Sequence, residues 1–268
     1  GLLVLALGIG IGFLAGGLRR AVEVPSTDLG EVIKQATLQI PVAQAEVAEE
    51  PPVNDLRTIY IDIDEEASAR LQEVYDRSML LHRIVQTEGD LVPATIRSEG
   101  KVIEADLRIK GDFNDHIDTD KWSFRIELKS DKLYGMSRFS IQHPKTRNYL
   151  YEWLHMEMAR REGLLAPRAD FVNVVVNGNS TGIYYLEEHF TKELIESQGR
   201  REGPIVRFVE DTFLDMESQY IAMMGYAPKS VLPARRIERA KVAAYGEKRL
   251  NQSENLSRQL QQALDLMR

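Results

Sequence analysis

Residues 104–190 constrain the fold more than any other part of the chain, because the spacing of apolar residues changes there several times. The segments ADLRIKGDF, KWSFRIELK and YGMSRFSIQHP predict strands, NYLYEWLHMEMARREG has the spacing of an amphipathic helix, and DFVNVVVNGNSTGIYYLEEHF predicts a hairpin. Asn177-Gly178 is the strongest local signal, since this dipeptide favours a two-residue hairpin turn. The order of elements predicts an α+β fold in which one helix covers a mostly antiparallel sheet.

The residues before this stretch continue the pattern. TIYIDID alternates apolar and polar residues and predicts a strand. In the segment that follows, Ala67, Leu71, Val74 and Leu80 lie near one another at helical spacing, which predicts a surface helix. VPATIRSEG and KVIEADLRIKG then predict a hairpin with Gly100 in its turn.

The chain after residue 190 is predicted to be mostly helical, with one short apolar strand in PIVRFVED. Near the end, Leu256, Leu260, Leu264 and Met267 follow three- and four-residue spacing, which is typical of an amphipathic helix. We expect this helix to pack on a lobe of which the chain holds only the beginning.

Residues 1–18 contain no charged side chain, and at about 1.5 Å per residue a helix of this length nearly crosses a lipid bilayer. This predicts a transmembrane anchor; the alternative is the apolar part of a signal peptide. Gly8, Gly12 and Gly16 share one helical face, which would let a second copy approach and form a homodimer. Alternatively, the three glycines have no role in association, because glycine is common in membrane helices.

These patterns divide the chain into four parts: the transmembrane anchor at residues 1–18, a flexible tether at 19–55, a folded domain at 56–210, and an incomplete helical continuation at 211–268. The tether mixes prolines with Ala, Val and Glu, a composition typical of a linker.

Net charge and cysteine content exclude several classes of function. The chain has a net charge of -7 and a pI near 5.4, which argues against nucleic acid as a partner because phosphate-backbone binders present a basic face. It has no cysteine, which excludes disulfides, thiolate nucleophiles and zinc-thiolate sites. The acids of the loop DFNDHIDTD do not form a calcium-binding EF-hand, since its sixth position holds Ile117 where a glycine is required.

The order of motifs in the middle of the chain resembles the CotH kinase family, the spore coat protein H-like atypical protein kinases. The resemblance covers about residues 57–210. The segments that carry it are Arg108-Ile-Lys110-Gly111, Lys121-Trp-Ser-Phe-Arg125-Ile-Glu-Leu128, Arg147-Asn148, Phe171-Val-Asn-Val-Val-Val-Asn177-Gly178 and Gly182-Ile-Tyr-Tyr-Leu-Glu-Glu188. Each segment alone is short, and their order and spacing together make the match specific.

The resemblance implies a kinase-like nucleotide-binding lobe followed by the start of a helical second lobe. The implied reaction is a transferase reaction, in which the γ-phosphoryl group of ATP passes to Ser or Thr of a protein substrate with Mg²⁺ bridging the phosphates. The apolar segment at residues 1–18 predicts a single-pass membrane protein, and because relatives of this family often work outside the cytoplasm, the resemblance implies that its folded domain is extracytoplasmic. Arg19-Arg20 favours the opposite side by the charge-bias rule.

The first candidate cofactor-binding residues are Lys110 and Gly111, at the end of a predicted strand. A glycine at a tight turn lets backbone amides approach the phosphates of ATP. Many relatives read Arg-Gly-Asn-Ser-Ser at this place, whereas this chain has Lys-Gly-Asp-Phe-Asn at residues 110–114. The loss of both hydroxyls and the gain of an acid leave two readings open, a phosphate loop and an exposed acidic turn.

Lys121 and Arg125 both fall in the basic strand motif that the resemblance assigns to phosphate neutralisation, and the sequence does not choose between them. In the following helix, Glu157 lies within the apolar stripe. A carboxylate facing the sheet needs a cationic partner, which Lys110, Lys121 or Arg125 would supply. Alternatively Glu157 lies at the edge of the stripe, where it reaches water or pairs with Arg161.

Glu188 matches a glutamate of the family at the end of the last strand, where the chain continues toward the second lobe. Alternatively, Glu188 is a surface carboxylate that has no functional role. The catalytic residues and the carboxylates that hold Mg²⁺ are expected beyond Arg268, and no metal ligand is assigned within the chain. Two other functions stay open from the sequence: a non-catalytic envelope or surface binding and assembly module on the same fold, and a transport or signalling subunit held together by the glycine-striped helix.

Overall fold

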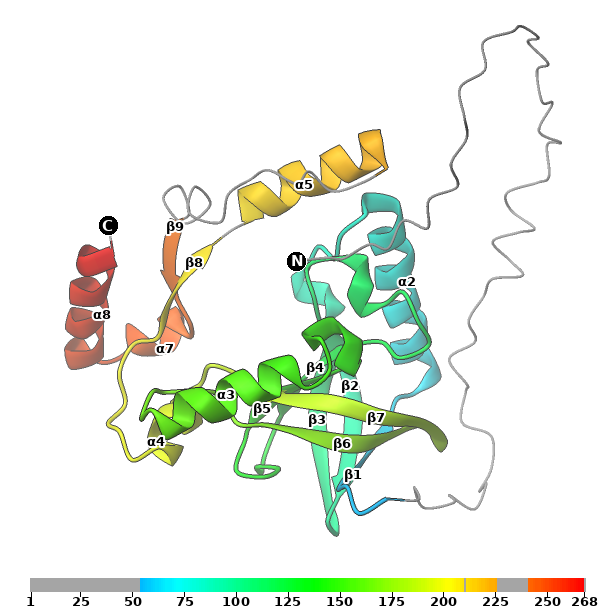
Figure 1. The fold of residues 1–268 in the computed structure, drawn as a ribbon, viewed down its shortest axis with the longest axis horizontal. Helices are drawn as coiled ribbons and strands as arrows, with labels where there is room; N and C mark the ends of the chain where they lie inside the picture. Colours follow the sequence, from blue (N-terminus) through cyan, green and yellow to red (C-terminus); the bar gives the residue numbers. More distant parts are fainter. Residues whose placement is uncertain (1–53, 210, 226–240, 268) are drawn as a thin grey trace, which may run out of the picture. The chain divides into compact units, whose positions relative to one another are not determined.

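The computed structural model describes residues 54–209, 211–225 and 241–267, all of which belong to one compact unit spanning residues 39–268. The centre of this unit is a closed seven-stranded barrel (Figure 1). In spatial order its strands are β1 (Thr58–Asp62), β2 (Val92–Ser98), β3 (Lys101–Ile109), β4 (Phe124–Leu128), β5 (Arg138–Gln142), β7 (Asn179–Glu188) and β6 (Ala169–Val176). All neighbouring strands are antiparallel except β1 and β6, which pair in parallel.

The parallel pair of β1 and β6 closes the barrel, with Ile59 opposite Val174. Two asparagines hold this seam. The backbone amide of Asn173 donates to the carbonyl of Arg57 at 2.9 Å, and the side-chain oxygen of Asn177 accepts from the backbone amide of Ile63 at 2.7 Å. The predicted open sheet of a kinase-like nucleotide-binding lobe was therefore wrong. Alternation shows which residues of a strand face the core, but it does not show that the first and sixth strands meet.

Both predicted hairpin turns are confirmed by their backbone angles. Glu99 and Gly100 have φ values of 49° and 76°, and Asn177 and Gly178 have values of 48° and 77°. Two successive positive φ angles are what a two-residue turn of the primed type requires. These turns set the register of β2 with β3 and of β6 with β7.

The barrel interior is filled by apolar side chains from alternate positions of each strand, as expected for a small closed barrel. The fully buried members include Ile59, Ile61, Ile96, Leu107, Ile126, Phe139, Ile141, Val172, Val174 and Tyr184. Because the apolar residues point inward, the polar residues of the same strands lie on the outer face of the barrel, and this outer face carries the site described below.

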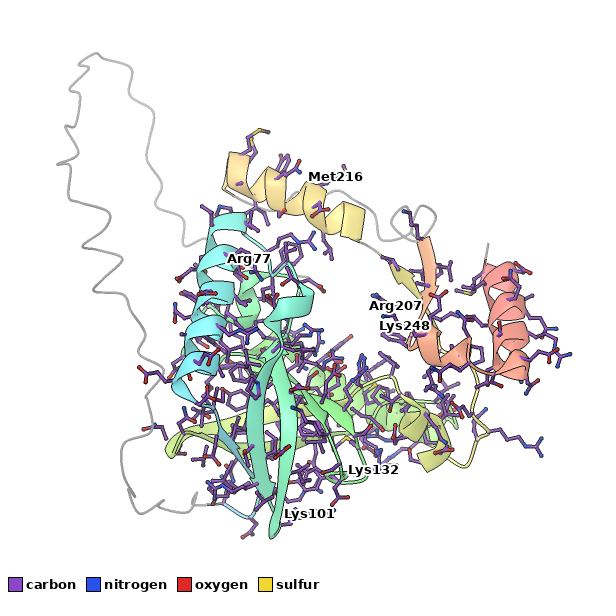
Figure 2. The ribbon with its side chains drawn as sticks, turned by 180° about the vertical axis from the view of Figure 1, so that it is seen from behind. Arg77, Lys101, Lys132, Arg207, Met216 and Lys248 are labelled. Carbon is purple, nitrogen blue, oxygen red and sulfur yellow. The ribbon has the colours of Figure 1, made fainter. Side chains whose placement is uncertain are left out.

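The helix that buries side chains against the barrel is α2 (Glu65–Leu81), whereas the predicted covering helix at residues 148–162 contacts β6 without a fully buried residue. Leu71 and Val74 of α2 are buried, and Tyr75 stacks on Trp122 with ring centroids 4.9 Å apart. Arg77 binds both carboxylate oxygens of Asp90 at 2.9 and 2.8 Å, which ties α2 to the short helix η1 (Glu88–Asp90) (Figure 2).

The later predicted helix does form, as α3 (Tyr151–Arg161), but it has no buried residue. Leu150, Leu154 and Met158, which belong to the apolar stripe that predicted its packing, are exposed, and Trp153 of the same stripe is half-buried. The single covering helix of the predicted fold was thus assigned to the wrong segment. Helical spacing alone identifies an amphipathic helix, but it does not identify the surface that the helix covers.

The remaining described elements are η2 (Asn114–His116), η3 (Pro144–Arg147), α4 (Lys192–Ser197), β8 (Val206–Val209), α5 (Asp211–Met224), β9 (Lys241–Ala244), α7 (Glu247–Leu250) and α8 (Glu254–Met267). The strands β8 and β9 form a separate antiparallel pair. The strand predicted in PIVRFVED and the amphipathic helix predicted near the end of the chain are therefore present.

The described helices contradict the prediction of a single-pass membrane protein. Across residues 54–209, 211–225 and 241–267, every helix is too short or too polar to cross a bilayer. The segment on which the prediction rested, residues 1–18 with the glycine stripe proposed to mediate a homodimer, lies outside the described residues, as does most of the predicted tether.

Candidate functional site

The outer face of the barrel carries a row of polar side chains that runs straight across four strands. Arg108 of β3 lies opposite Arg125 of β4, Arg125 lies opposite Ser140 of β5, and Ser140 lies opposite Glu187 of β7. Residues opposite one another on neighbouring strands are close enough to interact. The row therefore places two arginines and one carboxylate on the same side of the sheet.

Lys110 joins this row from the residue that follows β3. Its buried ammonium group donates to Glu187 Oε2 at 2.8 Å and to Gln142 Oε1 at 2.9 Å. The amide group of Gln142 donates to the same Glu187 oxygen at 2.9 Å. These contacts form a closed triangle between β3, β5 and β7, which fixes the position of the lysine ammonium group.

Arg147 of η3 brings a further cation to the triangle. Its Nη2 atom lies 3.5 Å from Glu187 Oε2, and its Nε atom lies 2.9 Å from a carboxylate oxygen of Glu152 on α3. Among the residues that the structure describes, Glu187 is thus the carboxylate that both Lys110 and Arg147 contact.

The electrostatics of this cluster show a surplus of positive charge. Burial lowers the pKa of Lys110 to about 8, and the attraction of Glu187 offsets only part of this effect. Burial by itself raises the pKa of Glu187, but the cations Lys110, Arg147 and Arg125 outweigh it and hold this pKa at about 2. Burial and the neighbouring charge of Arg108 lower the pKa of Arg125 to about 10. A cluster with these properties favours binding of an anion.

The loop after Lys110 folds back on itself. Gly111 has a φ of 126°, and a Cβ atom at this position would lie 2.3 Å from the ring of His116. The His116 ring also hydrogen bonds to Ser123 Oγ through Nδ1 at 2.9 Å, and the Lys110 amide donates to the Ser123 carbonyl at 2.8 Å. Gly111 therefore serves close packing of the loop against His116, which holds Lys110 at the strand end.

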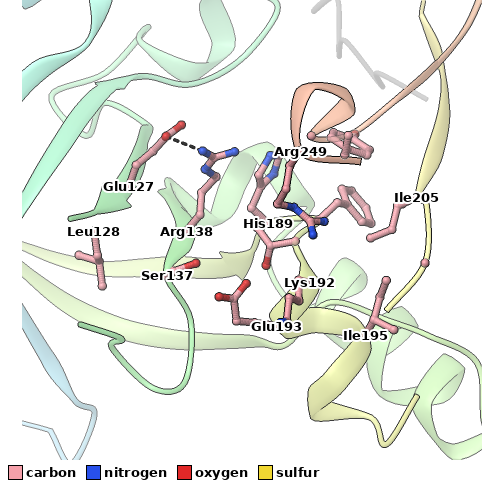
Figure 3. Close-up of a pocket in the computed structure, with 15 residues that line it drawn as sticks. Glu127, Leu128, Ser137, Arg138, His189, Lys192, Glu193, Ile195, Ile205 and Arg249 are labelled. Atoms are coloured by element: carbon pink, nitrogen blue, oxygen red, sulfur yellow. Dashed lines mark hydrogen bonds and ion pairs between the residues drawn. The ribbon is translucent and has the colours of Figure 1, made fainter. Parts of the chain in front are cut away.

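A cavity of about 410 Å³ lies where the chain leaves β7 (Figure 3). Its wall combines the rings of His189, Phe190 and Tyr245 with the charged side chains of Arg138 and Arg249. Phe190 and Tyr245 stack with ring centroids 4.9 Å apart, and the ring of His189 meets Tyr245 edge-on at 5.3 Å. The carboxylates of Glu127 and Glu193 also line it, so the cavity offers flat aromatic surfaces together with charges of both signs.

The cationic cluster and the cavity are connected through one contact, because a guanidinium nitrogen of Arg125 hydrogen bonds to Nδ1 of His189. The Arg207 guanidinium lies over the ring of Tyr245, another residue of the cavity wall, at 5.3 Å. Figure 2 shows Arg207 with Lys248 on the part of the chain formed by β8, β9 and α7. Cations therefore contact two of the rings in the wall, His189 and Tyr245.

A comparison with protein-family models matches residues 107–264 to the family described as CotH kinase protein, which is more than half of the 268 residues. The chain belongs to the CotH kinase protein family. The match begins in β3 and ends in α8, so it includes α5, β9 and α7, beyond residue 210 where the resemblance of motifs ends. Among curated proteins, none matches this chain.

Of the residues predicted to bind ATP in this CotH-family chain, the structure brings Lys110, Gly111 and Arg125 to one place. Lys121 lies elsewhere: its ammonium group lies 5.9 Å from the centre of the Tyr184 ring and would be 3.2 Å from a Cβ atom placed on Gly182. Of the two cations that the sequence left as alternatives, Arg125 lies in the cluster.

Glu157 and Glu188 also lie outside the cluster. Glu157 forms an ion pair with Arg160 on the same helix, so it does not pair with the sheet cations. Glu188 is fully buried and binds the Arg168 guanidinium through both of its carboxylate oxygens. Whether either residue contacts a nucleotide stays a prediction.

The sequence-based reasoning missed Glu187, Gln142, Arg147 and His189. For two of these the signal was present, because alternation along β7 places Tyr185, Glu187 and His189 on one face, opposite to Leu186 and Glu188. Arg147 stands in the matching segment Arg147-Asn148, but it was not assigned to the site. For Gln142 the sequence holds no comparable signal, since its place in the cluster depends on how β5 lies beside β7.

Proposed function

We propose that this CotH-family chain binds ATP and transfers its γ-phosphoryl group to Ser or Thr of a protein substrate. The name of the family supports a kinase activity. The observation that carries the proposal is the buried surplus of cations around Lys110 and Arg125 beside an aromatic-walled cavity. Phosphoryl transfer depends chiefly on positioning and on stabilising negative charge, which is what such a cluster offers.

The cavity suits the base and sugar of a nucleotide. Its volume of about 410 Å³ falls within the range of small-molecule sites, and its wall includes two stacked rings, Phe190 and Tyr245. A purine ring would gain from contact with such aromatic faces. Arg125 and Lys110 would then meet the phosphates, since charge-assisted hydrogen bonds to phosphate oxygens are among the strongest that side chains form.

Glu187 would act in this site by holding Lys110. Its carboxylate fixes the ammonium group at 2.8 Å and keeps it charged, and Gln142 accepts a second hydrogen bond from the same nitrogen. A lysine held in this way costs little further entropy when it meets a phosphate. Arg147, which pairs with Glu152 at 2.9 Å and lies 3.5 Å from Glu187, would add a further cation near the phosphates.

Mg²⁺ would accompany the nucleotide. When bound, it would supply positive charge that offsets the charge of the phosphates. Such an ion needs only one or two carboxylates besides the phosphates. Within the part of the chain that the structure describes, no three His, Asp or Glu side chains converge on one point, so we assign no residue to it.

A non-catalytic binding module is the second candidate, and one observation favours it. The ring of His116 occupies the space beside Gly111, so the loop after β3 is packed closed and does not leave room at its glycine for a phosphate group. A chain of this kind would bind a nucleotide or another anion without transferring a phosphoryl group.

The test is calorimetric titration of the full chain with Mg·ATP, using Lys110→Met and the matched control Lys121→Met. We expect binding by the wild-type chain, about tenfold or greater weakening in Lys110→Met, and unchanged binding in Lys121→Met. Equal losses in both variants would contradict the assignment of the site, and absence of binding by the folded wild-type chain would contradict the proposal.

Transfer is tested separately by incubating the same proteins with radiolabelled ATP, Mg²⁺ and casein as a general acceptor. Label incorporated by the wild-type chain and lost in Lys110→Met supports a kinase. Binding without incorporation, whether into casein or into the chain itself, favours the non-catalytic module.

A further inference from the structure

His189 contacts both parts of the proposed site. It follows β7, and its backbone amide donates to the Arg138 carbonyl at 3.1 Å, which continues the strand ladder and fixes the place of the residue. The imidazole ring accepts a hydrogen bond from Arg125 on one side and lies edge-on to Tyr245 on the other. His189 is also part of the cavity wall (Figure 3).

The direction of the hydrogen bond to Arg125 is fixed by chemistry. A guanidinium group has only donors, so Nδ1 of His189 must accept and the ring proton must reside on Nε2. The ring is held in the neutral form, because burial and then the charges of Arg125 and Arg138 lower the pKa of His189 to about 2. His189 therefore remains an acceptor for Arg125 across the whole physiological pH range.

Arg125 needs such a partner. It lies directly opposite Arg108, whose like charge repels it, and its buried Nε atom has no hydrogen-bond partner among the described residues. No carboxylate within the described residues forms an ion pair with Arg125. The neutral ring of His189 is thus the group that fixes where the guanidinium points.

We propose that His189 is a positioning residue, which holds the Arg125 guanidinium toward the phosphates of a nucleotide through Nδ1 while its ring forms the wall of the base cavity. The inference rests on the proposed function, since it takes Arg125 as a phosphate contact. According to this inference, a side chain that lines the cavity for the base also positions a cation that contacts the phosphates. Loss of the Nδ1 acceptor should therefore weaken binding of a ligand that has phosphates and no base.

The test uses the full chain and Mg·tripolyphosphate, a ligand without base or sugar, in calorimetric titrations. The variants His189→Asn and His189→Gln are compared, because an Asn amide oxygen lies as many bonds from Cβ as Nδ1 does, whereas the Gln amide reaches the place of Nε2. We expect His189→Asn to keep wild-type affinity within about threefold, and His189→Gln to lose about tenfold. Equal affinities of the two variants would overturn the proposal.

A double-mutant cycle with Arg125→Ala provides the second readout. If His189 acts through Arg125, His189→Gln should have no further effect on tripolyphosphate binding once Arg125 is removed. Additive losses would overturn the inference while leaving the proposed function intact. Failure of the wild-type chain to bind either tripolyphosphate or ATP would overturn both, and binding of ATP without binding of tripolyphosphate would overturn the inference alone.

Discussion

Glu187 and Glu188 are neighbours in β7, yet their carboxylates bind different cations on opposite faces of the barrel wall. Glu187 accepts from Lys110 at 2.8 Å on the outer face. Glu188 is fully buried and is held by Arg168 Nε at 2.9 Å and Nη2 at 2.5 Å. Arg168 also donates to the carbonyls of Tyr134 and Gly135, so the second pair ties the end of β7 to the turn before β5. Glu187 is thus part of the candidate site, whereas the contacts of Glu188 stabilise the packing of β7.

The first prediction separates these two roles. Glu188→Gln keeps the size of the side chain but leaves Arg168 without its anion, and we expect the free energy of unfolding to fall by about 2 kcal/mol. Urea denaturation followed by circular dichroism measures this change. The dissociation constant for Mg·ATP should stay at the wild-type value, because Glu188 faces away from the cluster.

Glu187→Gln is the matched comparison, since it alters the adjacent residue in the same way. We expect it to weaken Mg·ATP binding, because Lys110 loses the carboxylate that fixes it. The reverse pattern, with binding lost in Glu188→Gln and retained in Glu187→Gln, would show that the family resemblance and not the geometry identified the functional glutamate.

The local elements of the fold were predictable from the sequence, and the way the strands join was not. Asn177-Gly178 required a tight turn whatever surrounded it, and alternation marked the buried positions of β3 and β4. Closure of the barrel depends on Asn173 and its neighbours meeting β1, more than a hundred residues earlier in the chain. No periodicity within a strand reports such a contact.

The candidate site was predictable to a similar extent. Lys110 was identified because it stands with Gly111 at the end of a predicted strand, and Arg125 because it falls in the basic strand motif that the resemblance assigns to phosphate neutralisation. Glu187 was missed in favour of Glu188, although alternation along β7 distinguishes the two residues. Arg147 enters the cluster from a short helix, and its position follows from tertiary packing alone.

The second prediction concerns the pH dependence of binding. Burial lowers the pKa of Lys110 to about 8, so a substantial fraction of the ammonium groups is deprotonated at pH 8. A bound triphosphate adds negative charge and raises this pKa, so binding near pH 8 should take up protons, and affinity should fall as the pH rises above 8. Calorimetry in two buffers of different ionisation enthalpy measures the protons taken up. Lys110→Met should abolish the uptake; uptake unchanged in this variant would assign it to another group.

The third prediction concerns Gly111. A Cβ atom there would lie 2.3 Å from the ring of His116, and the φ of 126° is unfavourable for any other residue. Gly111→Ala should therefore lower the free energy of unfolding by about 2 kcal/mol or more. Gly100→Ala is the control, since Gly100 also has a positive φ but has open space around it, and it should cost about 1 kcal/mol.

A double variant then identifies the cause. Removing the ring in His116→Ala should make the further change Gly111→Ala less costly than in the wild-type chain, because the clash is gone and only the backbone strain remains. If the two changes are additive in urea denaturation, the strain lies in the backbone and the ring has no part in it.

The last prediction tests which helix belongs to the core. Leu71 of α2 is 0% exposed, whereas Leu154 of α3 is 52% exposed, although both lie in an apolar stripe of an amphipathic helix. Leu71→Ala removes buried methyl groups and should lower the free energy of unfolding by about 2 to 5 kcal/mol. Leu154→Ala should change it by about 0.5 kcal/mol or less, as for a surface substitution. A large loss of unfolding free energy in Leu154→Ala would mean that another protein surface covers α3 in solution. Denaturation at two protein concentrations would then show whether that surface belongs to a second copy of the chain.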